Sequence, residues 1–236
     1  LSPTTDEESG PCFGVHLGWS GNHRMVLERL TTGECQLQMG VLHLSREGRL
    51  QAGESMETPE IFIAQSDNGL NAMSQQFHSY IRHNILKLPD PQRPRPVTVN
   101  TWEALYFDHR LDRLKELANA AAEVGSERFV LDDGWFLGRN DDTTSLGDWV
   151  PDPEKYPDGL HPIVDYVVDE KNMEFGLWIE PEMVNPQSEL YGQHPDWVLQ
   201  FAPYPHVTGR NQMVLDLTNP LVMNYLYDRI AALLSE

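Results

Sequence analysis

The sequence predicts an α/β fold in two parts, in which an antiparallel β segment precedes repeated strand–helix units with parallel strands. Three observations carry this prediction. Short apolar strands separated by glycine-containing turns open the chain, prolines crowd residues 88–96, and strands alternate with helices from Val97 onward. Regular structure cannot continue through so many prolines. We therefore expect a first domain over residues 1–87, a linker over residues 88–96 and a second domain over residues 97–236.

The first domain should contain four strands and one helix. Strand patterns cover residues 12–19, 25–30, 35–44 and 60–65, at a spacing of about ten residues. This spacing is typical of an antiparallel sandwich. Apolar residues at helical spacing then predict a connecting helix over residues 68–85.

The second domain should contain three strand–helix repeats. The expected strands are 97–102, 128–132 and 174–180, and the expected helices are 109–124, 159–171 and 219–234, with a short strand at 212–217. Such a pattern fits either a doubly wound sheet or a (β/α)8 barrel. The doubly wound alternative lacks its glycine-rich phosphate loop, because residues 102–108 contain no glycine. A barrel takes ~250 residues, so three repeats fill only part of one.

Composition narrows the classes of function. Hydrophobic residues make up 40% of the chain and charged residues 22%, a balance typical of globular proteins. The net charge of −19 argues against binding to the phosphate backbone of nucleic acids. No apolar run reaches the ~18–20 residues of a membrane span. Two cysteines are too few for a disulfide scaffold. We expect a cytoplasmic protein that binds a neutral or polar ligand, and neither nucleic acid nor a membrane.

Acids and tryptophans end all three expected barrel-side strands. Trp102 ends the first strand, Asp132 and Asp133 end the second, and Trp178 ends the third. The carboxyl ends of parallel strands meet at one rim, where functional residues gather. Carboxylates bind sugar hydroxyls through charge-assisted hydrogen bonds, and an indole covers the apolar face of a pyranose. The pattern therefore predicts a carbohydrate site.

The sequence allows two roles for several of the residues at this rim. Adjacent strand residues point to opposite faces, so both aspartates can reach one ligand only if Asp133 lies in the turn; otherwise Asp133 caps a helix. Glu180 and Glu182 either support the site or belong to the loop. Arg210 either pairs with the acidic rim or forms a surface ion pair. The acids lack the spacing of a metal-binding loop, so we expect neither a metal nor a cofactor.

These motifs, in this order, resemble the bacterial α-galactosidases of glycoside hydrolase family 36. The segments that carry the resemblance are 100–108 (NTWEALYFD), 129–136 (FVLDDGWF), 139–149, 175–184 (FGLWIEPEMV), 194–197 and 209–217. The resemblance implies the tail of an antiparallel β-sandwich followed by the first part of a (β/α)8 TIM barrel. It implies retaining hydrolysis of terminal α-linked galactose from oligosaccharides such as melibiose and raffinose, by a homo-oligomer that needs no cofactor.

The resemblance also implies which residues act. Five residues would line the galactose subsite: Trp102, Asp132, Asp133, Trp178 and Arg210. The family's nucleophile is an aspartate in a Lys-Trp-Asp motif after the fourth barrel strand, so it is expected beyond Glu236, with the acid/base further on. Retaining hydrolysis needs both carboxylates. We therefore expect an internal fragment with no catalytic residue of its own, inactive when isolated.

Two alternatives remain at this stage. The chain is a non-catalytic carbohydrate-binding module or degenerate paralogue if it binds sugar without belonging to an active enzyme. It belongs to a galactosyl-transferring relative, similar to a raffinose synthase, if the acceptor is another sugar instead of water.

Overall fold

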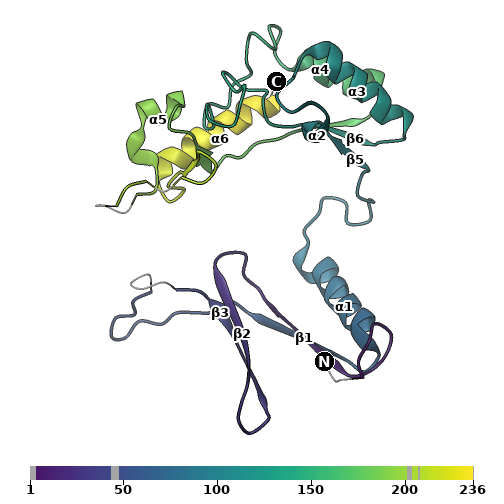
Figure 1. Cartoon of the computed structure of the whole chain (residues 1–236), viewed down its shortest axis with the longest axis vertical. Coiled ribbons are helices and arrows are strands. Elements are labelled where there is room, and N and C mark those ends of the chain that lie inside the picture. Colours follow the sequence, from purple (N-terminus) through teal and green to yellow (C-terminus); the bar gives the residue numbers. More distant parts are fainter. Residues whose placement is uncertain (1–3, 44–47, 201–203, 207, 236) are drawn as a thin grey trace. The chain divides into compact units, whose positions relative to one another are not determined.

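The computed structural model describes residues 4–43, 48–200, 204–206 and 208–235. The chain divides into two compact units, residues 1–93 and 94–236 (Figure 1). The point of division lies within the proline-rich segment 88–96. No helix in the described part of the chain is long and apolar enough to cross a membrane.

The first unit is built from two antiparallel strand pairs and a helix. Strand β1 (Cys12–Leu17) pairs with β4 (Ile61–Ser66), and β2 (His23–Arg29) pairs with β3 (Cys35–Val41). Each pair forms its own two-stranded sheet. The antiparallel pairing expected from the sequence is therefore confirmed, and the last residue of the expected strand 35–44 lies outside the described residues.

Helix α1 (Gly69–Tyr80) packs closely on β1 and continues as a π-helical turn, Ile81–Ile85. A side chain on Gly14 would come within 2.5 Å of Met73 Sδ and of a Phe77 ring carbon. Glycine at this position therefore allows the apolar face of the helix to lie directly on the strand backbone.

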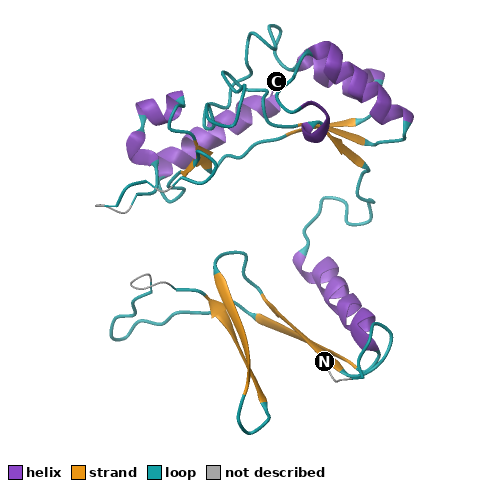
Figure 2. Ribbon diagram, viewed as in Figure 1, coloured by secondary structure: helices purple, strands orange, loops and turns teal. Residues whose placement is uncertain are grey.

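The second unit contains the parallel sheet that the strand–helix alternation predicts. Its strands are β5 (Thr98–Asn100), β6 (Arg128–Leu131) and β7 (Glu174–Leu177), in the order β5-β6-β7 (Figure 2). The crossover segments contain α3 (Leu111–Glu123) and α4 (His161–Asp165), and α4 continues as a π-helical turn, Tyr166–Glu170. Helix α6 (Pro220–Ser235) follows the third strand. Both strand pairs are parallel, as predicted.

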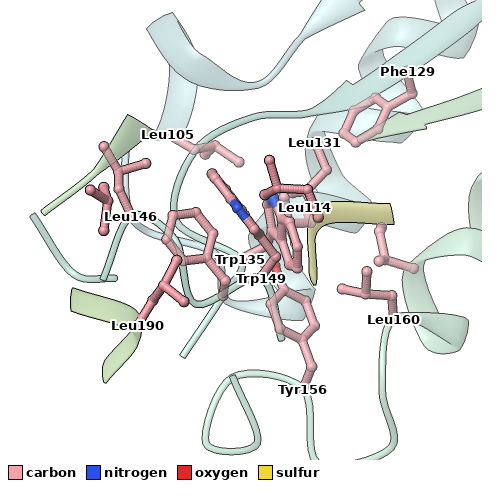
Figure 3. Close-up of a cluster of buried hydrophobic side chains, with 14 of the residues drawn as sticks. Leu105, Leu114, Phe129, Leu131, Trp135, Leu146, Trp149, Tyr156, Leu160 and Leu190 are labelled. Carbon is pink, nitrogen blue, oxygen red and sulfur yellow. The ribbon is translucent and has the colours of Figure 1, made fainter. Parts of the chain in front are cut away.

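The core of this unit extends into the long segment between β6 and α4. Trp135 and Trp149 come from this segment and are buried beside Leu131 of β6 and Leu114 of α3 (Figure 3). The ring centroids of the two tryptophans lie 6.2 Å apart. An aromatic pair removes a large apolar area from water, so packing of these side chains helps to hold the loop against the sheet.

The sequence predictions place some element ends incorrectly. Strand β5 ends at Asn100, and Trp102 begins a short helix, α2 (Trp102–Leu105), instead of ending a strand. The reason is local, because the Asn100 Oδ1 accepts a hydrogen bond of 2.8 Å from the backbone N–H of Trp102 and turns the chain. Strand β7 likewise ends at Leu177, one residue before Trp178.

The irregular stretch after β7 also contains structure that the sequence did not reveal. The predicted strand 212–217 is shorter, β9 (Met213–Val214), and it pairs antiparallel with β8 (Met183–Val184), outside the parallel sheet. A short helix, α5 (Glu189–Gln193), and a 3-10 turn, Pro195–Trp197, lie between them. Two-residue strands and single helical turns are too short to give a periodic signal.

One buried histidine ties the α2–α3 connection to this core. His109 is 2% exposed, and its Nδ1 lies 3.0 Å from the hydroxyl of buried Tyr156. Burial, and next the positive charge of Lys155, lower the pKa of His109 to about 4. The imidazole is therefore neutral in the folded protein at neutral pH.

This lowered pKa predicts an acid-dependent loss of stability. The unfolded chain binds a proton at His109 near pH 6.5, but the folded chain does so only near pH 4. Acidification between these pH values therefore lowers the free energy of unfolding, by up to about 3 kcal/mol. Urea unfolding at a series of pH values should show this slope, and His109→Asn should flatten it. The exposed His161→Asn variant is the control and should keep the wild-type slope; an equal slope in all three proteins would contradict the assignment.

Candidate functional site

The carboxyl ends of β5 and β6 are joined through side chains. The backbone N–H of Asp132 donates to Thr101 Oγ1 at 3.0 Å, and Asn100 Nδ2 donates to Asp132 Oδ2. The other oxygen of Asp132 accepts the backbone N–H of Asp133 at 2.7 Å. The carboxylate of Asp132 is thus held at the rim, and the residue stays partly exposed.

Asp133 lies in the turn that follows β6, which is the placement that two ligand-facing aspartates require. Gly134 completes this turn with φ of +116°, and a side chain there would come within 3.3 Å of the His109 ring. Lys155 stabilises the turn, since its Nζ donates a hydrogen bond of 2.7 Å to the Gly134 carbonyl. The turn is therefore fixed by backbone geometry and by a charged donor.

The side chain of Asp133 does not cap a helix; it forms a buried ion pair with Arg139. Arg139 Nε donates to Asp133 Oδ1 at 2.9 Å, and Arg139 Nη2 donates to Oδ2 at 2.7 Å. The side chains are 0% exposed for Arg139 and 6% exposed for Asp133. A bidentate guanidinium fixes the plane of a carboxylate and leaves each oxygen with further acceptor capacity.

Arg139 is one of two residues of this network, with Asn185, that the sequence does not predict. Its Nη1 donates to the Thr144 carbonyl at 2.6 Å and to Asn185 Oδ1 at 3.1 Å, and its guanidinium lies 5.7 Å from the centroid of the Phe136 ring. Basic residues are rare in the acidic second part of the chain, and this rarity is the feature of the sequence that could have drawn attention to Arg139. Its ion pair with Asp133 lies in a loop, where no helical or strand spacing in the sequence would predict it.

The two tryptophans at the rim are both half-buried and held by aromatic neighbours. Trp178 packs edge-on against Trp149 at 6.2 Å, and its carbonyl accepts the indole N–H of Trp135 at 2.9 Å. Trp102 packs edge-on against Tyr106 and Phe107, each at 5.2 Å. Each indole therefore has a fixed orientation and an accessible part.

Arg210 is exposed and lies in a tight turn from Gly209 to Gln212. The turn is closed by two backbone hydrogen bonds between these residues, at 3.0 and 3.2 Å. Arg210 and Asn211 both have positive φ, at 52° and 60°, as a type I′ turn requires. The Asn211 carbonyl accepts a hydrogen bond of 2.7 Å from Asn185 Nδ2, so Asn185 reaches both this turn and Arg139.

Glu180 shows that these charges lie within electrostatic reach of one another. Burial, and next the neighbouring Glu182, raise the pKa of Glu180, while the positive charges of Arg210 and Arg139 oppose this shift. Gln212 Nε2 donates to Glu180 Oε2 at 3.3 Å. Glu180 is thus a partly buried acid beside the Arg210 turn, and Glu182 is exposed.

The rim therefore offers carboxylates, an amide, a cation and indole rings, which are the groups that bind polyhydroxylated ligands. Asp133, Arg139, Asn185 and the Arg210 turn form one connected network, and Asp132 is joined to it through the backbone of Asp133. Trp102 belongs to the neighbouring strand end. Among the described residues, no group of three His, Cys, Asp or Glu side chains could hold a metal ion.

Two family models match the chain. The Melibiase model matches residues 55–236, and the model of the glycosyl hydrolase family 36 N-terminal domain matches residues 1–51. The α-galactosidase of Escherichia coli is 47% identical over 235 residues, which is 100% of this chain and 33% of that protein. The chain spans about a third of the length of the curated relatives that it matches.

Solved structures of similar proteins have the same fold. AgaA, a GH36 α-galactosidase from Geobacillus stearothermophilus, is similar with a TM-score of 0.89 at 40% identity, over 100% of this chain and 33% of that chain. Variants of AgaA in complex with stachyose and with raffinose each give a TM-score of 0.88 at 40% identity, covering 100% and 99% of this chain and 33% and 32% of theirs. The motif order, the strand ends and both family models agree, and we conclude that this chain belongs to glycoside hydrolase family 36, the melibiases.

Proposed function

We propose that this chain carries the sugar-binding part of a retaining α-galactosidase, which releases terminal α-linked galactose from oligosaccharides such as melibiose and raffinose. The observation that supports this most directly is the network at the ends of β5 and β6, where Asp132 and Asp133 are held in fixed positions. The relatives are named α-galactosidases, and solved complexes of AgaA contain raffinose or stachyose.

In this proposal each rim residue has a distinct task. Asp132 and Asp133 accept hydrogen bonds from galactose hydroxyls, and Trp102 and Trp178 cover apolar faces of the ring. Arg210 supplies a positive charge at the edge of the site. A neutral sugar gains specificity from such groups because a missing or inverted hydroxyl leaves a fixed polar group without a partner.

We further propose that β5, β6 and β7 begin a (β/α)8 barrel whose later strands carry the reacting groups. Retaining hydrolysis needs two carboxylates ~5–5.5 Å apart, one as nucleophile and one as acid/base. The proposal places both outside the 236 residues. The cytoplasmic location and the homo-oligomeric state remain predictions from the sequence.

The central experiment compares the whole enzyme with this chain. The protein that contains these residues should hydrolyse a chromogenic α-galactoside with retention of configuration, while the 236-residue chain alone should show no turnover above background. Normal turnover by the isolated chain would show that the catalytic pair lies within it. Hydrolysis products with inverted configuration, or transfer to a second sugar in place of water, would favour a different mechanism or a galactosyl-transferring relative.

Removing the charge of Asp132, which is partly exposed, or of Arg210, which is exposed, should weaken sugar recognition without unfolding the protein. We expect Asp132→Ala and Arg210→Ala each to lower kcat/KM for α-galactosides by about tenfold to a hundredfold, since a charge-assisted contact in a site contributes about 1.5–3 kcal/mol. Thermal unfolding should change little. The matched controls are Asp158→Ala and Arg113→Ala, which remove the same charges from exposed positions; unchanged kinetics in Asp132→Ala would exclude that carboxylate from the site.

Asp133→Ala should behave differently, because it leaves Arg139 charged and unpaired in the interior. We expect the free energy of unfolding to fall by about 3–5 kcal/mol, which urea unfolding measures. The double variant Asp133→Leu/Arg139→Met replaces the pair by apolar side chains and should recover most of that stability. If Asp133 also binds galactose, the stable double variant remains inactive; recovery of activity together with stability would assign Asp133 a purely structural role.

A further inference from the structure

Asn185 is fully buried between two parts of the rim that are distant in sequence, and it contacts both. Its Oδ1 accepts hydrogen bonds from Arg139 Nη1 at 3.1 Å and from the Leu146 backbone N–H at 2.9 Å. Its Nδ2 donates to the Asn211 carbonyl at 2.7 Å. One amide therefore connects the partner of Asp133 to the turn that carries Arg210.

We propose that Asn185 is a positioning residue: together with Arg139 it holds the Arg210 turn in a fixed position relative to Asp133, so that both can engage one galactoside. The expected effect of Asn185 on catalysis rests on the proposed function. The structural part of the proposal, the restraint on the turn, rests on hydrogen bonds in the structure and does not depend on the proposed function.

The backbone of the turn shows why an external restraint is needed. Left-handed backbone costs roughly 1–2 kcal/mol for an ordinary residue, and Arg210 adopts it with φ of 52°. Asparagine tolerates this region well, so Asn211 adds little strain, whereas glycine at position 210 would remove most of the strain. Arginine in such a turn persists only when surrounding contacts determine the conformation.

Two contacts supply that restraint on the side away from solvent. Gln212 is 3% exposed and its Nε2 reaches Glu180 Oε2 at 3.3 Å, which anchors the end of the turn. Asn185 binds the carbonyl in the middle of the turn. Because Asn185 is itself bound by the Arg139 guanidinium, its amide is polarised and its orientation is fixed. A strained residue that is rigidly supported and carries an exposed charge is well suited to present that charge to a ligand.

The chemistry of the amide provides a selective test. Asn185→Asp keeps an oxygen toward Arg139 and the Leu146 N–H but replaces the donor by an oxygen that faces the Asn211 carbonyl. This variant should therefore release the turn while it preserves the contact with Arg139. Asn185→Ala removes both contacts without adding a charge, and it serves as the second variant if Asn185→Asp does not fold.

The control is Ser188→Ala, three residues along the chain. Ser188 is 6% exposed, and its side chain caps α5 by accepting the Tyr191 N–H at 3.0 Å; within the described part of the chain, this is the hydrogen bond that its side chain makes. Loss of a helix N-cap lowers the free energy of unfolding by about 1 kcal/mol. This variant therefore shows how a general loss of stability affects the exchange rates and the kinetics.

Amide hydrogen exchange tests the structural part in the full protein. We expect the Gly209 and Gln212 amides to exchange about tenfold faster in Asn185→Asp and Asn185→Ala, and at the wild-type rate in Ser188→Ala. Equal rates in wild type and the Asn185 variants overturn the proposal. This measurement is decisive whether or not the protein hydrolyses galactosides.

A double-mutant cycle on kcat/KM tests the consequence for the site. Asn185→Asp should lower kcat/KM by about tenfold to a hundredfold in the wild-type background, but by less than about twofold in Arg210→Ala, because the group that it positions is already gone. Additive losses overturn the claim that Asn185 acts through Arg210. A wild-type protein without galactosidase activity contradicts the proposed function instead, and the exchange rates still decide the positioning claim.

Discussion

The second unit depends on one buried ion pair, between Asp133 and Arg139. Burying two charges carries a desolvation cost that their attraction offsets only with good geometry and further hydrogen bonds. Both conditions hold here, since the contact is bidentate and the remaining donors of Arg139 reach Thr144 and Asn185. The pair therefore does more than neutralise charge. It fixes the course of the chain from the end of β6 into the loop that follows.

That loop explains how a segment of irregular backbone can form part of a core. Long loops without regular structure are uncommon in compact domains and are usually functional. Around the ion pair, Trp135 and Trp149 pack inward, and Lys155 binds the carbonyls of Gly134 and Arg139 at 2.7 and 2.8 Å. Polar groups of the backbone are thus satisfied by charged side chains where a helix or sheet would otherwise satisfy them. The loop is therefore both packed into the core and hydrogen-bonded through its backbone.

Repeating patterns in the sequence were sufficient to locate the longer helices and strands, but contacts between distant residues leave no such pattern. Alternating and helical patterns predicted β6, β7, α3 and α6 to within a few residues, because such patterns report which face of an element is buried. The prediction that Trp102 ends a strand is wrong because Asn100 Oδ1 accepts the backbone N–H of Trp102 and turns the chain before the apolar pattern ends. Arg139 and Asn185 were missed because their roles come from tertiary contacts across 6 and 46 residues, for which no local pattern exists.

The adjacent aspartates show how environment gives two identical side chains different properties. Two neighbouring carboxylates repel each other, and the repulsion is strongest where water is excluded. Arg139 compensates the charge of the buried member, Asp133, while Asp132 stays partly exposed with Asn100 and backbone donors around it. The two acids therefore lie side by side in different surroundings, one against a guanidinium and one against an amide. Under the proposed function, a galactose with two neighbouring hydroxyls would meet one acceptor held by a cation and another held by an amide.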